Sequence, residues 1–486
     1  MLEPDDVVAG RKPHQLVGLV LGPVAFAVCV LSAAPEGLSA AGWSVAALAI
    51  WMAIWWATEA VPLFVTALLP LAVLPLLGVE GIDSAAAPFA HPVVFLLLGG
   101  FLIGLALEKW NLHRRIAFHI ILAVGSYPLS LIAGKMLATA FLSMWITNTA
   151  TTIMVIPIAM SLIAVVAPDG KKSQGEAANF GTAMMLGIAY AASIGGMASL
   201  VGSPTNLLAA SYLDEVFGIE MTFLDWTLFA LPISVLLLAC AYIVLTRIAF
   251  PVSNRLGKVD AGLVEGMLRE MGPMTGPEKR VCAVFTTVAL CWIFSPLVED
   301  RLGFDISDTG IALIGAIALF TIPAHWPDRT FLLDATAVRR IPWEVLILFG
   351  GGLSLAKAID TTGLAVWIGN SLSFLDAMPL LVVIFGVTLL VVLLTELMSN
   401  TATVAAFLPI AGSLALGSDV APLLFVMPIA LAASSAFMLP VATPPNTLVF
   451  GTGYVTLPQM MRAGALLNLF GTAIIATAVT LAARFL

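Results

Sequence analysis

Charge is scarce in this chain of 486 residues, in which Asp, Glu, Lys and Arg together make up 10%. A typical soluble domain carries about 25%. Hydrophobic residues make up 60% and the mean hydropathy is +1.05. Because apolar runs that approach or reach a bilayer span recur along the sequence, the chain is predicted to be an all-α polytopic membrane protein without a large soluble domain. The net charge of −8 then describes loops and termini, and says little about partners.

Residues that carry metal, redox or acid–base chemistry are also scarce. The five histidines are scattered near segment ends and form no metal-ligand cluster. The four cysteines lie in apolar stretches without a CxxC spacing, which is typical of small core residues. No basic patch is interleaved with aromatic residues, so nucleic acid is not an expected partner.

Two short polar motifs interrupt the apolar sequence. The first polar motif is 147–151 and the second polar motif is 399–403, and both lie between apolar arms. A shift of 252 positions superimposes residues 146–162 on 398–414 without a gap, and nine positions are then identical: Asn148, Thr149, Ala150, Thr151, Pro157, Ile158, Ala159, Ser161 and Leu162. This repetition indicates a duplicated binding element.

The duplication divides the chain into two halves. Residues 1–40 carry an N-terminal span that lacks a clear cleavage site and is expected to be retained. Residues 41–250 form the first repeat, 251–278 a cytoplasmic linker and 279–486 the second repeat. Each repeat contains a hairpin (129–166 and 380–415) and a broken helix (180–213, interrupted at 202–206, and 421–455, interrupted at 442–446).

Lys and Arg residues give the topology. With a cytoplasmic N-terminus and about eleven spans, most of the 21 Lys and Arg residues fall on the cytoplasmic side. Each repeat then crosses the membrane an odd number of times, so the repeats are inverted. The hairpins are interpreted as re-entrant because the joint between their arms is polar but uncharged; two full spans each would leave the repeats inverted. Inverted repeats with paired broken helices are typical of secondary transporters.

A helix broken at membrane depth exposes N–H groups that suit anions and carbonyl groups that suit cations. Asn, Ser and Thr add neutral donors and acceptors, and Ser143 and Thr395 each lie one turn before a polar motif. The alternative is that these hydroxyl groups only bond to helix carbonyls or hold helices together. The duplicated pattern favours one Na⁺ at each motif.

The two polar motifs and the two interruptions, at 202–206 and 442–446, contain neither Lys nor Arg. A bound dianion therefore needs cations and helix N-termini to neutralise it. Each charge moved across the membrane is worth about 2.3 kcal/mol per 100 mV. Inward transport of a dianion with the potential therefore needs more than two Na⁺, and a third cation would have no visible site. Lys135 and Lys357 are candidate substrate partners, although snorkelling to the interface is the commoner fate. Without His, Cys, Asp or Glu in these elements, an enzyme is not expected.

The sequence resembles the divalent anion/sodium symporters, the Na⁺-coupled di- and tricarboxylate carriers. The residues that carry the resemblance are 145–152, 399–403, Thr58-Glu59-Ala60-Val61-Pro62 and 434–446, and it covers nearly the whole chain. The resemblance implies a homodimer in the inner (cytoplasmic) membrane. It also implies a scaffold domain and a transport domain, each drawn from both repeats, with elevator-type movement.

The same resemblance implies particular ligands. Na⁺ would be held by Ser143, Thr147, Asn148 and Gly202 at the first site, and by Thr395, Met398, Asn400 and Ala442 at the second. The substrate carboxylates would meet Asn148, Thr149, Ser203, Asn400, Thr401 and Thr443. Thr147 departs from the family's usual Ser, which keeps the hydroxyl and adds a methyl. The expected function is Na⁺ symport of succinate, malate or fumarate; a Na⁺-independent dicarboxylate exchanger and a citrate or sulfate carrier stay open.

Overall fold

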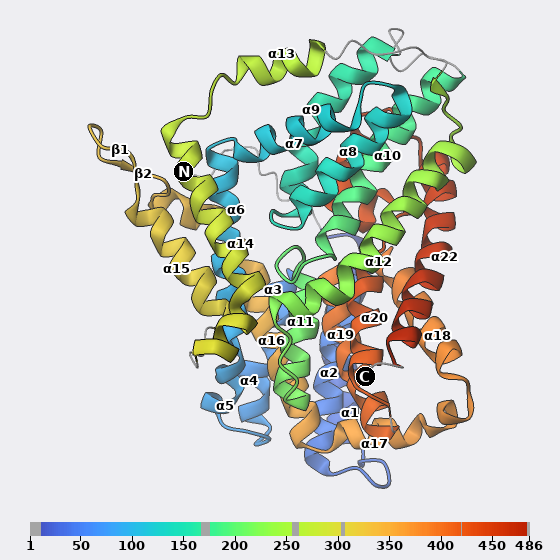
Figure 1. Ribbon diagram of the computed structural model, residues 1–486. Helices are drawn as coiled ribbons and strands as arrows, with labels where there is room; N and C mark the ends of the chain where they lie inside the picture. Colours follow the sequence, from blue (N-terminus) through green and yellow to red (C-terminus); the bar gives the residue numbers. More distant parts are fainter. Residues whose placement is uncertain (1–10, 167–174, 255–261, 303–306, 419, 484–486) are drawn as a thin grey trace.

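Apolar helices make up nearly all of the computed structural model, which describes residues 11–166, 175–254, 262–302, 307–418 and 420–483 (Figure 1). The first half contains α1 (Pro13–Leu31), α2 (Ala40–Thr58), α3 (Leu63–Thr66), α4 (Leu69–Leu76), α5 (Ile82–Ala86), the 3-10 helix η1 (Ala87–Ala90), α6 (Pro92–Lys109), α7 (Leu112–Val124), α8 (Pro128–Ser143), α9 (Asn148–Val166), α10 (Glu176–Gly196), α11 (Pro204–Phe217), α12 (Phe223–Ile243) and the π-helix η3 (Val244–Ala249).

The second half contains α13 (Gly262–Glu270), α14 (Gly276–Leu302), α15 (Asp308–Thr321), η5 (Ala335–Arg340), α16 (Trp343–Thr361), α17 (Leu364–Ser371), η6 (Ser373–Ala377), α18 (Leu380–Thr395), α19 (Asn400–Gly417), α20 (Leu423–Ala433), η7 (Pro440–Ala442), α21 (Pro444–Gly451) and α22 (Leu457–Ala482). In this half the helices α16 to α22 follow the order of α6 to α12, and two short strands are added. The added strands form an antiparallel hairpin of β1 (Pro323–His325) and β2 (Thr330–Phe331), in which Pro323 pairs with Phe331. Residues 255–261 of the predicted linker lie outside the described residues.

The helices have lengths that suit a membrane. Among the described residues, eight are long and apolar enough to cross a bilayer, or nine if α16 and α17, which meet at 75°, are counted as one span. Five shorter apolar helices of 10–17 residues accompany them: Leu63–Leu76, Pro128–Ser143, Asp308–Thr321, Leu380–Thr395 and Leu423–Ala433. A polytopic all-helical membrane protein is therefore confirmed, while the number of about eleven spans stays a prediction.

The two halves are matched in sequence position and opposite in direction. The helices α7, α8 and α9 begin 252 residues before α17, α18 and α19. Figure 1 shows α8 and α9 in the upper part of the molecule and α18 and α19 in the lower part, so the two hairpins enter from opposite faces. The broken helices interleave with them: α10 packs against α8 and α9, while α11 packs against α19 and α20.

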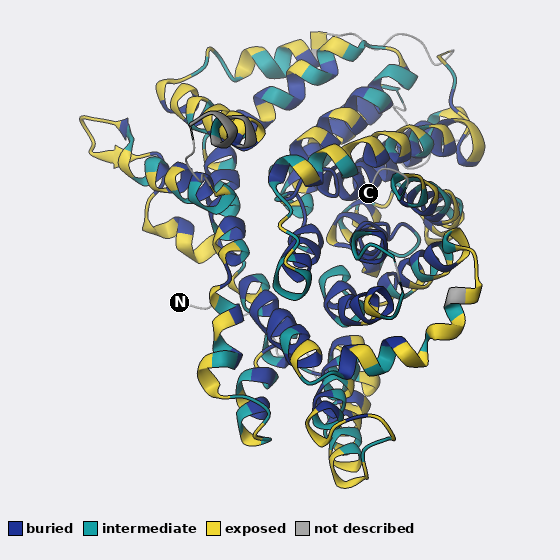
Figure 2. Ribbon diagram, turned by 60° about the horizontal axis from the view of Figure 1, so that its bottom comes forward, coloured by how far each residue is buried: buried dark blue, intermediate teal, exposed yellow. Residues whose placement is uncertain are grey.

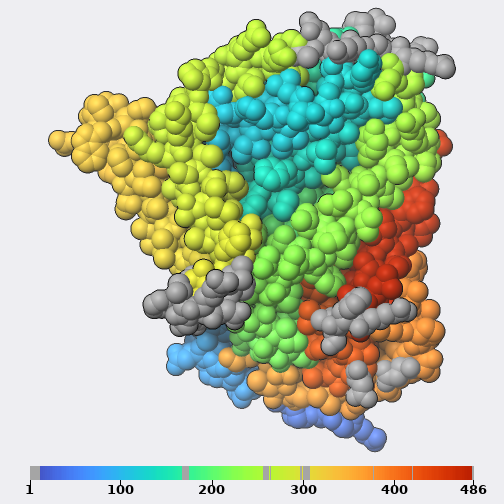
Figure 3. Space-filling model, in the orientation of Figure 1, coloured from blue at the N-terminus to red at the C-terminus, as the bar shows by residue number. Residues whose placement is uncertain are grey.

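Helix contacts define two groups. We call α8–α12 with α18–α22 the binding bundle, because α10, α20 and α22 link its members to one another. We call α1–α6 with α14–α16 the flanking group, in which α16 packs against α2, α3 and α4, and α15 against α6. The helices α7 and α17 connect the two groups. Among the helices long enough to cross a bilayer, burial is greatest in α10. Buried residues gather where the helices pack together (Figure 2), and α15 with the β hairpin projects at one side (Figure 3).

Small residues let the core of the bundle close. The run from Ala191 to Gly196 lies on α10, and a Cβ atom on Gly195 would lie 2.2 Å from the carbonyl oxygen of Ala140 on α8. A larger residue would separate α8 from α10. The cysteines were wrongly predicted as core residues: Cys291 is exposed and the other three are half-buried, at helix surfaces that lipid can cover.

The close approach of α8 and α10 predicts the effect of one methyl group. Gly195→Ala should lower Tm in detergent, because overpacking a tight contact typically costs about 1–3 kcal/mol. Gly386→Ala is the matched control, since nothing lies within 4 Å of a Cβ atom at this helical glycine. Thermal unfolding of the two purified variants measures the difference. Equal Tm values would contradict the packing described.

Candidate functional site

The first half is broken at two places that lie side by side. The helix α8 ends at Ser143 and α9 begins at Asn148, so the first polar motif opens a helix. The helix α10 ends at Gly196 and α11 begins at Pro204. Proline suits the first turn of a helix because it lacks an N–H group. The observed break is therefore 197–203, earlier than the predicted 202–206, whose last three residues begin α11.

The second half repeats these two breaks. The helix α18 ends at Thr395 and α19 begins at Asn400. The helix α20 ends at Ala433 and α21 begins at Pro444, with the single turn η7 between them. The predicted interruption at 442–446 again covers only the end of the break, because Pro444 and Pro445 occupy the first turn of α21. Four helix ends from each half thus converge on the middle of the binding bundle.

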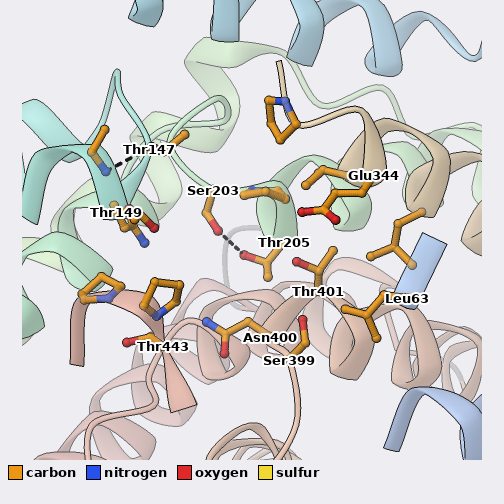
Figure 4. A pocket seen from close by; sticks show the side chains of 18 of the residues that line it. Leu63, Thr147, Thr149, Ser203, Thr205, Glu344, Ser399, Asn400, Thr401 and Thr443 are labelled. Atoms are coloured by element: carbon orange, nitrogen blue, oxygen red, sulfur yellow. Dashed lines mark hydrogen bonds between the residues drawn. The ribbon is translucent and has the colours of Figure 1, made fainter. Parts of the chain in front are cut away.

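These ends line one cavity of about 1340 Å³. The other wall comes from α6 and α16 of the flanking group. Figure 4 shows Thr149, Ser203, Asn400, Thr401 and Thr443 around the space, from both halves of the chain. All six residues expected to meet substrate line the cavity: Asn148, Thr149, Ser203, Asn400, Thr401 and Thr443. Four residues expected at the Na⁺ sites do so as well: Thr147, Gly202, Met398 and Ala442.

The two remaining expected Na⁺ ligands lie behind this lining. Ser143 and Thr395 are fully buried. The Ser143 hydroxyl donates to Oδ1 of Asn148 at 2.5 Å, and the Thr395 hydroxyl donates to Oδ1 of Asn400 at 2.7 Å. Each half therefore places a hydroxyl and an amide oxygen together at the start of a helix, in two contacts that repeat at the interval of 252 residues.

The donor set consists of neutral oxygens. Hydroxyl groups, amide oxygens and the free carbonyls of broken helices replace the hydration shell of an alkali cation, while helix N-termini attract anions. Among the described residues, no group of three or more His, Cys, Asp or Glu residues is arranged to hold a metal ion. The arrangement suits a hard monovalent cation together with an anionic ligand.

Two asparagines that were not predicted as site residues hold the breaks in shape. The Asn206 amide donates to the carbonyls of Gly196 and Ser199 at 2.9 and 2.7 Å. The Asn446 amide donates to the carbonyls of Ala436 and Leu439 at 3.1 and 3.0 Å. Both side chains are fully buried. The partners lie seven and ten residues back from each Asn. The sequence signal that could have identified both is the repeated order of a hydroxyl residue, Pro, one further residue and Asn, at 203–206 and 443–446.

Glu396 is the other residue that was missed. This buried carboxylate accepts the backbone N–H groups of Phe437, Met438 and Leu439 at 2.7, 2.8 and 3.0 Å. Asn468 adds a fourth donor at 2.7 Å. Glu396 thereby satisfies the N–H groups that the second break frees. Its counterpart in the first half is Met144, whose carbonyl accepts the Ser199 hydroxyl at 2.5 Å, so the two breaks are held by different means.

Other predicted candidates lie away from the cavity or at its edge. Lys135 is fully buried inside the protein, so the expected snorkelling is wrong, and it does not line the cavity. Lys357 lies 3.6 Å from Glu215 and outside the lining as well. Glu59 ends α2 in the left-handed conformation (φ 48°) and lines the cavity mouth.

Known proteins resemble this chain over nearly its full length. The family described as the sodium:sulfate symporter transmembrane region matches residues 14–486. The sodium-dependent dicarboxylate transporter SdcS of Staphylococcus saprophyticus is 38% identical over 95% of this chain and 90% of its own. SdcS of Staphylococcus aureus is 36% identical over 96% and 91%. A crystal structure of the Alcanivorax borkumensis YdaH transporter covers 97% of both chains with a TM-score of 0.55 and 14% identity, which shows the fold alone.

The role of Glu396 predicts a loss of stability on neutralisation. Glu396→Gln should lower Tm in detergent, because the amide NH₂ in place of Oε2 cannot accept the N–H of Leu439, and the three hydrogen bonds to Oε1 lose their charged acceptor. Hydrogen bonds to a charged group contribute about 1.5–3 kcal/mol. Asn468→Ala is the matched comparison, since it removes only one of the four donors and should lower Tm less. Thermal unfolding measures both. A larger effect of Asn468→Ala would contradict the role assigned to the carboxylate.

Proposed function

Because the chain belongs to the sodium:sulfate symporter family of membrane transporters, we propose that it is a secondary active transporter that couples uptake of a C4-dicarboxylate such as succinate, malate or fumarate to Na⁺. The observation that carries the proposal is the pair of hydroxyl–asparagine contacts, Ser143 with Asn148 and Thr395 with Asn400. They supply two equivalent cation sites on opposite sides of one cavity.

We assign Na⁺ to the buried side of each asparagine and the substrate to the side that faces the cavity. The first Na⁺ takes Ser143, Thr147, Asn148 and Gly202, and the second takes Thr395, Met398, Asn400 and Ala442. The substrate carboxylates take Asn148, Thr149 and Ser203 on one side and Asn400, Thr401 and Thr443 on the other. Each asparagine then contacts both cation and substrate, so that binding of one favours binding of the other.

Charge makes this coupling obligatory. A dianion in a cavity whose polar motifs carry no cationic side chain is stable only when Na⁺ is already bound, since helix N-termini supply partial charges alone. At least two Na⁺ bind, and a third cation accompanies them if transport moves net positive charge inward. Nothing in the described residues locates that third cation.

The cavity mouth gives the direction of opening. Lys12, Glu108 and Arg340 line the cavity at the end where α1 and α16 begin and α6 ends. From the excess of Lys and Arg we infer that this end is cytoplasmic, that the cavity opens inward and that the N-terminus is cytoplasmic. We place the protein in the cytoplasmic membrane as a homodimer, with the binding bundle as the transport domain that moves elevator-fashion against the flanking group as scaffold.

A second candidate is transport of an inorganic oxyanion. The family description names sulfate, a dianion that the same neutral donors and cations can neutralise. The cavity is large for sulfate, and the similarity to sodium-dependent dicarboxylate transporters is stronger support for the dicarboxylate. Competition between sulfate and succinate for uptake discriminates between the two. A Na⁺-independent exchanger would instead show counterflow that is indifferent to Na⁺.

Coupling is tested by uptake into proteoliposomes. An inward Na⁺ gradient should drive accumulation of labelled succinate above its outside concentration, because the cation sites must fill before the dianion binds. Replacement of Na⁺ by choline is the control, and a negative internal potential should raise the rate if more than two Na⁺ accompany each dianion. Equal uptake with and without the gradient would rule out symport.

The site assignment is tested by two substitutions. Asn148→Ala and Asn400→Ala should each reduce Na⁺-driven uptake about 10- to 100-fold, because each removes a group that contacts both charged ligands, worth about 1.5–3 kcal/mol. Asn370→Ala is the matched control, since Asn370 is exposed on α17 and lies outside the cavity lining. Folding is verified by Tm. Wild-type uptake in either site variant would refute the assignment.

A further inference from the structure

The helices α6 and α16 run from the face at which the cavity opens to the opposite face of the molecule. The end of α6 near Glu108 and the start of α16 near Glu344 line the cavity mouth. His91 precedes the first residue of α6, and Lys357 lies thirteen residues beyond Glu344 on α16. At 1.5 Å per residue, both lie roughly 20 Å or more from the mouth. They therefore mark the face at which the cavity is closed.

Charged side chains from three helices meet at this closed face. Nε2 of His91 lies 3.3 Å from a carboxylate oxygen of Asp214 and 4.0 Å from one of Glu215, both on α11. The Glu215 carboxylate also lies 3.6 Å from the Lys357 ammonium on α16. We call these four residues the closed-face ion cluster. It connects α11, in the binding bundle, to α6 and α16, in the flanking group.

The position of this cluster is distinctive. Of the ion pairs among the described residues, those of His91 and Lys357 join the binding bundle to the flanking group. The pairs Lys109–Asp334 and Arg340–Glu108 lie at the mouth end and stay within the flanking group and the segment before α16. Attraction between charges across the group boundary is thus concentrated at the face opposite the mouth.

A neutral His91 side chain also contributes to the contact with Asp214. Its Nδ1 atom accepts the backbone N–H of Val93 at 3.3 Å, which leaves the proton of a neutral imidazole on Nε2, the atom that faces Asp214. The His91 side chain is 8% exposed, and the Glu215 side chain is 22% exposed. Partial burial makes these contacts less screened than ordinary surface pairs.

An apolar seam lies beside the cluster. Leu208 and Tyr212 of α11 face Leu353 and Ala356 of α16 around a space of about 10 Å³. Such a space holds about one water molecule at most, so the seam excludes water and ions. Apolar contacts of this kind slide past one another more readily than paired charges separate, because separated charges in a partly buried site lose their partners.

We propose that the closed-face ion cluster is a latch that holds the binding bundle against the flanking group in the inward-open state and must dissociate before the cavity opens on the other face. The proposal rests on the proposed function in one respect, that the site is exposed alternately to the two faces. It assigns a role to Lys357, Glu215, Asp214 and His91 that is separate from binding of substrate or Na⁺.

The latch is tested by charge reversal and charge swap. Lys357→Glu or Glu215→Lys places like charges together, and Glu215→Lys combined with Lys357→Glu restores an opposite pair. A reporter cysteine at Ala356, which is 3% exposed in the seam, is introduced after replacement of the four native cysteines. Each single reversal should raise the rate of labelling by a membrane-impermeant maleimide from the closed face about three- to tenfold, and the swap should restore the original rate.

Controls separate this effect from general damage. Glu220→Lys reverses an exposed charge five residues after Glu215, outside the closed-face ion cluster, and should leave labelling unchanged. Labelling of all variants is measured at the same pH. The latch is overturned if the single reversals leave labelling unchanged, or if the swap labels as fast as they do.

Labelling is read without Na⁺ and without substrate, so it is independent of what the protein carries. Failure of Na⁺-driven uptake with a normal labelling pattern would overturn the proposed function and leave the latch intact. If uptake is normal and the charge reversals leave the labelling rate unchanged, the latch is overturned and the function is left intact. A single reversal that fails to fold is recognised by its Tm, and the swap then decides alone, because an opposite pair must restore both Tm and slow labelling.

Discussion

Every backbone N–H and carbonyl group inside a bilayer must have a partner, because no water is present to supply one. This chain has four helix breaks in the middle of the binding bundle and so frees backbone groups where none can be left unpaired. Asn206 and Asn446 each bind two of the freed carbonyls, and Glu396 binds three of the freed N–H groups. The cavity exists because these side chains satisfy the breaks without filling the space between them.

The two halves solve this problem differently at one point. In the second half the carboxylate of Glu396 holds the break, whereas in the first half the neutral Ser199 hydroxyl bonds to Met144. A buried carboxylate therefore lies one residue after Thr395, whereas Met144 occupies the matching position after Ser143. At the two cation sites that we propose, this carboxylate raises the attraction for a cation at the second site relative to the first, so the repeat does not imply equal affinities.

Much of this arrangement could be predicted from the sequence, because the two repeats keep the same residue types at matched positions. The shift of 252 positions placed Asn148 on Asn400 and Ser143 on Thr395, and the structure brings both pairs to one cavity. The limits of the breaks were missed, since prolines at 204, 444 and 445 begin helices rather than interrupt them. Glu396 was missed because its partners are backbone groups 41 to 43 residues away, which no local pattern reveals.

Electrostatics explains why so few charges serve so large a site. A fixed lysine or arginine beside the polar motifs would bind a dianion at all times and would hold it equally well in every state, which opposes release. Neutral oxygens leave the site weak for the anion until cations arrive, so the charge that binds the substrate travels with it. Fixed ion pairs are then free to act elsewhere, at the boundary between the binding bundle and the flanking group. There Lys357 of α16 and Glu215 of α11 attract each other without contacting the cavity. The chain thus separates the charges that are carried from the charges that hold its parts together.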